Sequence, residues 1–139
     1  MNPVLLDTHA LVWLLSGNTR LGPRARDAIE RAAQVNNLVV SAITPWEIAM
    51  LVAKGKLTLG QDVGDWIREA LAQPGIRLEA LAPEIAVAST RLPWEIHPDP
   101  ADRMIVATAR HIDALLVTAD PQLLSYSAAG HFKTLPAET

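Results

Sequence analysis

Short apolar runs alternate along this chain with longer segments in which apolar residues recur every three or four positions. The runs at residues 4–6, 38–41 and 115–118 are typical of strands buried on both faces of a parallel sheet. Residues 76–81 alternate apolar and polar side chains, which predicts a strand nearer an edge, and residues 132–135 suggest a last short strand. The pattern therefore predicts about four to five strands.

Helical periodicity fills the intervals between these strands. The predicted helices cover residues 8–16, 23–35, 44–54, 62–73, 83–91 and 100–113. In the third of them, Pro45 is expected at the first helical position, and Gly55 follows the end. Strands that alternate with helices predict an α/β fold, with a mainly parallel central sheet and helices on both faces.

Composition narrows the class of protein. The 139 residues match one domain, residues 1–139, and 50% of them are hydrophobic, which is enough for a core. The absence of cysteine excludes disulfides, thiolate metal sites and a thiol nucleophile. The net charge of -3 argues against nucleic-acid affinity through a broadly basic surface. With neither a basic leader nor a long apolar stretch, the chain is expected in the cytoplasm and not in a membrane.

Five acidic residues stand where an apolar run gives way to the start of a helix: Asp7, Glu47, Asp99, Asp102 and Asp120. In a parallel α/β sheet, the strand ends and the helix starts that follow them gather on one edge. We therefore expect these carboxylates to meet in one cluster, although they are spread over most of the chain.

Helix capping is a simpler explanation of each acid taken singly. Aspartate is a preferred N-cap, acids favour the first helical turn, and Thr44 and Glu47 have the spacing of a capping box. The recurrence is harder to explain, because serine, threonine or asparagine would cap as well without adding charge. Two carboxylates about 4 Å apart repel by roughly 1 to 4 kcal/mol, so a cluster needs a compensating charge. A hard divalent ion with oxygen ligands, Mg²⁺ or Mn²⁺, meets that need.

Phosphodiester hydrolysis is the reaction class that such a metal site favours, because the ion activates water and offsets charge that develops on phosphorus. Two alternatives stay open. One is a metal-dependent phosphatase with Asp7 as covalent nucleophile, although His9 stands where such enzymes commonly carry a second acid. The other is a non-catalytic, acid-capped α/β module that acts only by binding a partner.

Four segments in chain order carry a resemblance to a known family. They are LLDTHALVWLL, SAITPWEIAMLVAKGKL, HPDPADRMIVATAR and LLVTAD. They resemble motifs of the PIN-domain family, and within it of the VapC toxins of toxin–antitoxin pairs. The resemblance implies a PIN domain, an endoribonuclease dependent on Mg²⁺ or Mn²⁺, a homodimer, and inhibition by a cognate VapB-type antitoxin. It assigns metal binding and catalysis to Asp7, Glu47, Asp102 and Asp120. Both aspartates of DPAD fit its third motif, and we favour Asp102 as the ligand and Asp99 as a cap or supporting group.

Side chains beside these acids have open roles. Thr8 and Thr118 either hydrogen-bond the acids or a water, or serve simple helix and strand ends. Arg103 either pairs with a carboxylate, contacts a substrate phosphate or points into solvent. Histidine suits Zn²⁺ better than Mg²⁺, so His9 and His97 are interpreted as peripheral.

Other basic and aromatic residues are interpreted as structural. Arg20, Arg24 and Arg26 are assigned to solvated surface in preference to an RNA-facing rim. Three tryptophans on apolar helical faces are assigned to the core or a dimer interface, and the fourth, in a proline-flanked loop, stays open. The three are Trp13, Trp46 and Trp66, and the fourth is Trp94.

Overall fold

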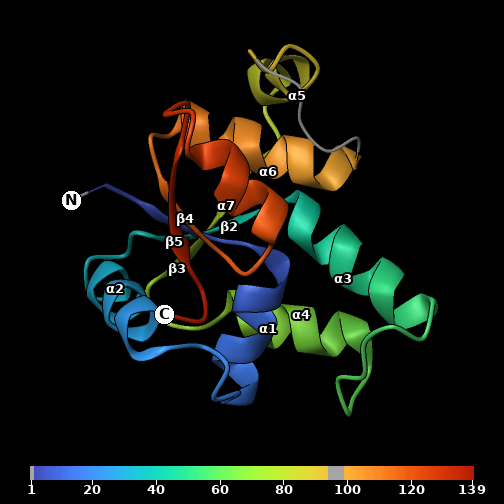
Figure 1. The fold of residues 1–139 in the computed structure, drawn as a ribbon. Coiled ribbons are helices and arrows are strands. Elements are labelled where there is room, and N and C mark those ends of the chain that lie inside the picture. Colours follow the sequence, from blue (N-terminus) through green and yellow to red (C-terminus); the bar gives the residue numbers. More distant parts are fainter. Residues whose placement is uncertain (1, 94–98) are drawn as a thin grey trace.

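Five strands form one parallel sheet in the computed structural model, which describes residues 2–93 and 99–139 (Figure 1). They are β1 (Val4–Leu6), β2 (Leu38–Ser41), β3 (Ile76–Glu79), β4 (Leu115–Thr118) and β5 (Lys133–Pro136). Their order across the sheet is β3-β2-β1-β4-β5, and every neighbouring pair is parallel. The predicted α/β class and parallel sheet are confirmed, and β3 lies at an edge as its alternation indicated.

Helices cover both faces of this sheet (Figure 1). Within the described residues they are α1 (Thr8–Ser16), α2 (Pro23–Gln34), α3 (Ile43–Ala53), α4 (Val63–Leu71), α5 (Pro83–Ser89), α6 (Pro100–His111) and α7 (Pro121–Ser127). Helices α1, α2 and α4 pack on one face, and α6 and α7 pack on the other. Helix α5 packs against α6, at the outside of this second layer.

The central strand β1 contributes side chains to two apolar cores, one on each face of the sheet. Val4 and Leu6 belong to the core that α1, α2 and α4 cover, whereas Leu5 belongs to the core of α6 and α7. All three side chains are buried. Burying a leucine contributes about 1.5–3 kcal/mol, and a slip of one residue would exchange the two faces, so the register of β1 is strongly specified.

The chain reverses its direction across the sheet at β1. From β1 it builds β2 and β3 on one side, and then crosses back to add β4 and β5 on the other. In open α/β sheets such a switch point leaves a crevice at the carboxyl ends of the strands. Asp7 follows β1 there, and its backbone N–H donates to the Val117 carbonyl of β4 at 3.0 Å. The topology thus places Asp7 at the mouth of the crevice.

The start of α3 differs from the prediction. The helix begins at Ile43, so Thr44 and Pro45 lie within its first turn, and Thr44 is not the N-cap. The Ile43 backbone N–H donates to the Ser41 hydroxyl at 3.2 Å. The Thr44 hydroxyl is buried and has no hydrogen-bond partner among the described residues. The predicted capping box of Thr44 and Glu47 is therefore wrong, because α3 begins one residue before Thr44 with Ala42 as its N-cap, and Glu47 accepts from the Thr8 hydroxyl instead.

Other predicted boundaries shift by a few residues. The edge strand β3 stops at Glu79, and α5 stops at Ser89. The helix expected to start after Asp120 forms as α7 at residues 121–127, and its limits are not predicted from the sequence because seven residues carry too little periodicity. Within the described part of the chain, none of the helices combines the length and the apolarity that a bilayer span requires.

Candidate metal centre

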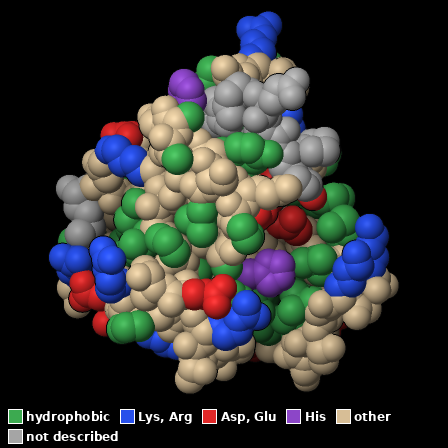
Figure 2. All heavy atoms as spheres, in the orientation of Figure 1, with side chains coloured by type: hydrophobic (Ala, Val, Ile, Leu, Met, Phe, Trp, Pro, Cys, Tyr) green, Lys and Arg blue, Asp and Glu red, His purple; other side chains and the backbone are tan. Residues whose placement is uncertain are grey.

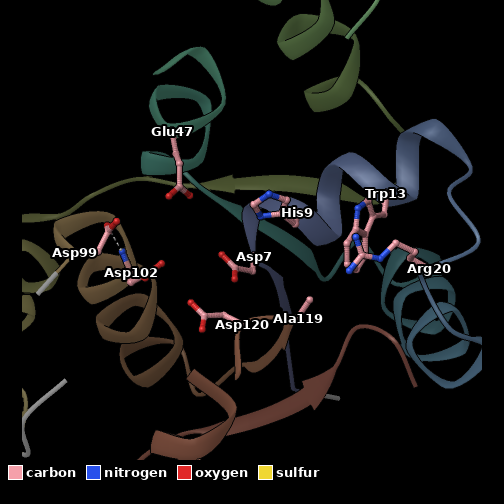
Figure 3. Close-up of a pocket in the computed structure, with 9 residues that line it drawn as sticks. All are labelled: Asp7, His9, Trp13, Arg20, Glu47, Asp99, Asp102, Ala119 and Asp120. Atoms are coloured by element: carbon pink, nitrogen blue, oxygen red, sulfur yellow. Dashed lines mark hydrogen bonds between the residues drawn. The ribbon is translucent and has the colours of Figure 1, made fainter. Parts of the chain in front are cut away.

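A cavity of about 390 Å³ opens at the carboxyl ends of β1 and β4, where the topology reverses (Figure 3). Its described lining residues come from three helices, α1, α3 and α6, and from the loops beside them and before α7: Asp7, His9, Trp13, Arg20, Glu47, Asp99, Asp102, Ala119 and Asp120. All five acids singled out in the sequence are among them. The structure therefore brings together carboxylates that lie up to 113 positions apart in the chain.

Asp7 is the most buried of these acids, with 7% of its surface exposed. It caps α1 through Oδ1, which accepts from the Thr8 backbone N–H at 2.8 Å. Its Oδ2 accepts from the Thr118 hydroxyl at 2.6 Å. Burial raises the pKa of the Asp7 carboxyl, although both hydrogen bonds act to lower it. The carboxylate is thus held in a fixed orientation, at a position where its negative charge is unfavourable.

Glu47 reaches the cavity from α3, and its carboxylate points into the space beside Asp7 and Asp102 (Figure 3). The buried Thr8 hydroxyl donates to Glu47 Oε1, which ties the start of α1 to α3. Burial raises the pKa of Glu47, and the neighbouring carboxylates of Asp7 and Asp99 raise it further. Of the two interpretations of Thr8 and Thr118, the structure shows the first: both hydroxyls hydrogen-bond the acids.

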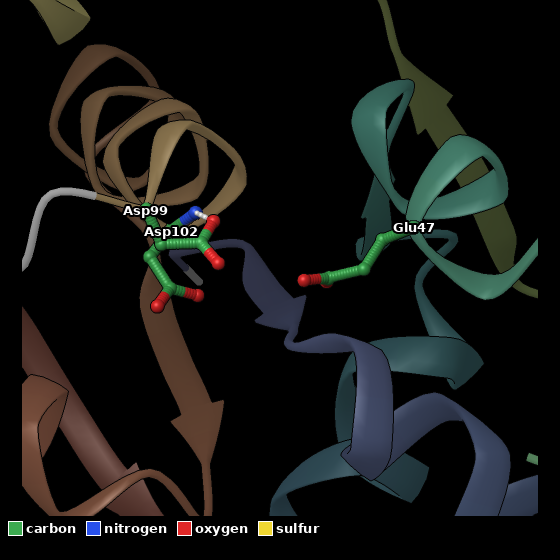
Figure 4. A group of neighbouring side chains, drawn as sticks. All are labelled: Glu47, Asp99 and Asp102. Atoms are coloured by element: carbon green, nitrogen blue, oxygen red, sulfur yellow. Dashed lines mark hydrogen bonds between the residues drawn. The ribbon is translucent and has the colours of Figure 1, made fainter. Parts of the chain in front are cut away.

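Asp99 and Asp102 enter the cavity together from the start of α6. Asp99 is the N-cap, since its Oδ1 accepts from the backbone N–H of Ala101 at 2.8 Å and of Asp102 at 3.2 Å. Three carboxylate oxygens lie within 4.8 Å of one another, one each from Asp99, Asp102 and Glu47 (Figure 4). Burial, reinforced by the charges of the other four cavity acids, raises the pKa of Asp102 to about 8.

Asp120 completes the group from the end of β4. Its Oδ1 accepts from the Gln122 backbone N–H at 2.8 Å and so caps α7. Its own backbone N–H donates to the Thr118 hydroxyl at 3.1 Å. Because the same hydroxyl donates to Asp7, Thr118 links two acids that come from adjacent strands.

The donor set fits a hard divalent cation. Every acid in the cavity offers carboxylate oxygen, the ligand type that Mg²⁺ and Mn²⁺ prefer. The raised pKa values of Asp7, Glu47 and Asp102 share a cause, which is that negative charges are gathered away from water. A bound cation would offset this negative charge, and the carboxylates would then no longer need protons to neutralise them.

Capping accounts for only part of the group. Asp7, Asp99 and Asp120 each cap a helix, as the sequence indicated. Glu47 and Asp102 lie within their helices and cap neither of them. Their carboxylates nevertheless face the same cavity as the three caps (Figure 3).

Several neighbouring residues have other roles than the ones expected. Arg103 Nε donates to the Ser89 carbonyl at 3.0 Å and so joins α6 to α5, a role outside the three interpretations of this residue. Trp66 is buried in the core, as predicted, but Trp46 is 55% exposed and so lies outside the core, and its alternative place in a dimer interface stays a prediction. Trp94 and His97 lie outside the described residues.

The far wall of the cavity was not anticipated from the sequence. His9 and Trp13 lie one helical turn apart on α1, with ring centroids 6.3 Å apart. Arg20 follows from the loop between α1 and α2. The spacing of His9 and Trp13 could have indicated a shared face of α1. No local signal indicates Arg20, because its place depends on how the loop folds back.

Comparison with known proteins identifies the class of this fold and site. The family model described as the PIN domain matches residues 4–128, and the chain belongs to the PIN-domain family. The predicted family and fold are therefore confirmed. A curated relative is Ribonuclease VapC22 of Mycobacterium tuberculosis, which is 36% identical over 126 residues, 91% of this chain and 93% of the relative.

Solved structures show the same fold. A chain of the VapBC2 complex from Rickettsia felis, bound to a DNA fragment from their promoter, matches with a TM-score of 0.68 at 15% identity. That match covers 96% of this chain and 97% of the other. A toxin–antitoxin complex from Klebsiella pneumoniae matches with a TM-score of 0.55 at 25% identity, over 84% of this chain and 86% of the other.

Proposed function

We propose that this protein is an endoribonuclease that depends on Mg²⁺ or Mn²⁺ and is the toxin of a VapBC-type toxin–antitoxin pair. The observation that carries the proposal is the meeting of five carboxylates in one cavity at the switch point of a PIN domain. A relative named as a ribonuclease, 36% identical over nearly the whole chain, supports the reaction class.

The four acids Asp7, Glu47, Asp102 and Asp120 are proposed to hold the metal. When bound, the ion would lower the pKa of a water molecule and offset the charge that develops on the scissile phosphate. The chain's own contribution is to hold the carboxylates still, through hydroxyl and backbone N–H donors rather than through flexible lysines. The Thr118 hydroxyl donates to Asp7, the Thr8 hydroxyl donates to Glu47, and the Gln122 backbone N–H donates to the Asp120 carboxylate.

The two alternatives receive less support. A phosphatase with Asp7 as nucleophile needs an exposed carboxylate oxygen, yet Asp7 is 7% exposed and both its oxygens accept hydrogen bonds. A binding module explains the three caps, but it does not explain why Glu47 and Asp102 add two further negative charges to the same cavity. Ribonuclease function accounts for both.

The partners follow from the same assignment. Solved structures with this fold include toxin–antitoxin complexes, so we propose a VapB-type antitoxin as inhibitor and RNA as substrate. A homodimer and a cytoplasmic location stay predictions.

Substituting Asp7→Asn tests the metal site. The change keeps the size of the side chain and removes the buried charge, so the fold should persist. Cleavage of total cellular RNA in Mn²⁺ should fall by at least about 100-fold, the upper range for disturbed metal sites. The measurement is the initial cleavage rate, with a thermal melt to confirm folding.

Asp113→Asn is the matched control. Asp113 is an exposed acid with its side chain 74% accessible, paired with Lys133 at 3.7 Å, and its φ of 51° suits asparagine. This variant should cleave at the wild-type rate. A wild-type rate in Asp7→Asn would refute the site, and a wild-type protein without Mn²⁺-dependent cleavage would refute the function.

A further inference from the structure

The wall of the cavity facing Asp99 and Asp102 carries an arginine held in a defined pose. The Arg20 guanidinium carbon lies 4.4 Å from the centroid of the Trp13 ring. Its Nη2 lies 3.5 Å from Glu138 Oε1. Figure 3 shows Trp13 and Arg20 side by side on this wall, with His9 between them and the carboxylates.

The charge of the cavity creates a problem for an RNA nuclease. RNA is a polyanion, and five carboxylates line the place where its backbone must be cut. Among the described residues of the lining, Arg20 is the one that carries a permanent positive charge. Figure 2 shows acidic side chains within a hollow, a histidine at its edge and a basic side chain beyond the histidine.

The other two arginines of this region are directed elsewhere. Arg26 donates to the carbonyls of Leu21 and Asn18, so it braces the loop between α1 and α2. Arg24 lines a separate hollow beside β4 and β5. Arg20 is solvated, as the sequence interpretation has it, with its side chain 60% exposed, but it also lines the cavity.

We propose that Arg20 binds a backbone phosphate of the RNA, next to the phosphodiester held at the carboxylates. Stacking on Trp13 fixes the guanidinium plane and leaves its N–H edges for a bidentate contact, which suits phosphate. Glu138 positions the side chain before RNA arrives. That ion pair is exposed, at 60% and 53% of the two side chains, and exposed ion pairs contribute little to stability, so a phosphate can displace it.

Trp13 itself serves as a platform for Arg20 and not for a base. Its ring is 7% exposed and packs in the core of α1, α2 and α4. The inference rests on the proposed ribonuclease function, and it concerns how the substrate is held rather than how it is cut.

Arg20→Gln tests the contact. KM for Mn²⁺-dependent cleavage of total cellular RNA should rise about 10-fold with kcat nearly unchanged, because the lost contact is equal in bound substrate and transition state. The slope of log KM against log KCl should fall by about 0.7, the value for one phosphate contact to a single strand. The increase in melting temperature with Mn²⁺ should match wild type, since the metal site is untouched.

Two further variants serve as controls for Arg20→Gln: one removes a charge outside the cavity, and the other keeps the charge of Arg20. Arg24→Gln removes the same charge from a neighbouring loop-to-helix site outside the cavity, and should leave KM and the salt slope unchanged. Arg20→Lys keeps the charge but loses the planar fork, so the salt slope should persist while KM rises about threefold.

The outcomes separate the inference from the function on which it rests. If wild type cleaves RNA and Arg20→Gln behaves like Arg24→Gln, the phosphate contact is overturned and the ribonuclease stands. The contact is also overturned if Arg20→Gln abolishes the Mn²⁺-induced rise in melting temperature, because the residue then acts through the metal site. If wild type shows no Mn²⁺-dependent cleavage, the function fails and the inference fails with it.

Discussion

At the scale of single residues, Asp99 is both the N-cap of α6 and a member of the carboxylate group in the cavity. Its Oδ1 accepts from two backbone N–H groups at the start of α6, and its carboxylate also lies within 4.8 Å of oxygens from Glu47 and Asp102. Capping and metal binding are compatible, because a helix N-terminus tolerates negative charge and holds the side chain still. Substitutions can separate the two roles.

Asp99→Asn should keep the cap, because asparagine caps helices as well as aspartate, whereas Asp99→Ala should lose about 1 kcal/mol of unfolding free energy. Urea unfolding in EDTA measures this difference. Calorimetric titration with Mn²⁺ should show weaker binding for Asp99→Asn, and still weaker binding for Asp102→Asn. Unchanged Mn²⁺ affinity in Asp99→Asn would reduce Asp99 to a cap alone.

At the scale of elements, the start of α3 shows where spacing along the chain misleads. Thr44 and Glu47 have the separation of a capping box, yet the Ile43 backbone N–H at the start of α3 donates to the Ser41 hydroxyl at the end of β2. Glu47 instead accepts from Thr8, which lies 39 positions away. A spacing rule considers residues within one segment. It does not take account of a hydroxyl from a distant segment, such as that of Thr8, which the fold brings to Glu47.

Thr44→Val is the corresponding prediction. The Thr44 hydroxyl is buried without a partner among the described residues, so a methyl of the same size should raise the unfolding free energy by about 1 kcal/mol. Urea unfolding measures the change, with Thr108→Val as a contrast because that hydroxyl donates to the Met104 carbonyl at 2.7 Å. A loss of about 1 kcal/mol in Thr44→Val would restore the capping box.

Most of the fold could be predicted because periodicity is a local property. The three buried runs became β1, β2 and β4 with unchanged limits, and α1 also kept its predicted limits. The convergence of the acids followed from parallel topology alone. The unpredicted parts depend on tertiary contacts: Arg20 is placed by a loop that turns at Gly17, and Arg103 by the docking of α5.

At the scale of the whole molecule, the acid cluster links folding stability to proton binding, and the metal that we propose would compete with those protons. The Asp102 carboxyl has a pKa of about 8 when folded, and about 3.9 when unfolded. Between these values the folded state binds more protons, so the metal-free protein should lose stability as pH rises from about 4 to about 8. The raised pKa values of Asp7 and Glu47 act in the same direction.

Mg²⁺ should therefore stabilise the protein more at higher pH, because fewer protons must be displaced. Thermal melts at pH 5, 6, 7 and 8, in EDTA and in excess Mg²⁺, should show a gap that widens with pH. In Asp102→Asn the gap should be smaller and flatter. A gap of constant size in the wild type would contradict the linkage between protons and metal.

The bond between Thr118 and Asp7 closes a loop of 111 positions, and this has a consequence for how the protein is made. A ribosome adds about 5–20 residues per second, so Asp7 is synthesised roughly 5 to 20 s before Thr118 in the neighbouring strand β4. Until β4 takes its place beside β1, neither Asp120 nor the hydroxyl that orients Asp7 is available. If the chain is the nuclease toxin we propose, it cannot attack the RNA that encodes it, or the ribosome that carries it, before residues 115–120 have been synthesised and β4 has paired with β1.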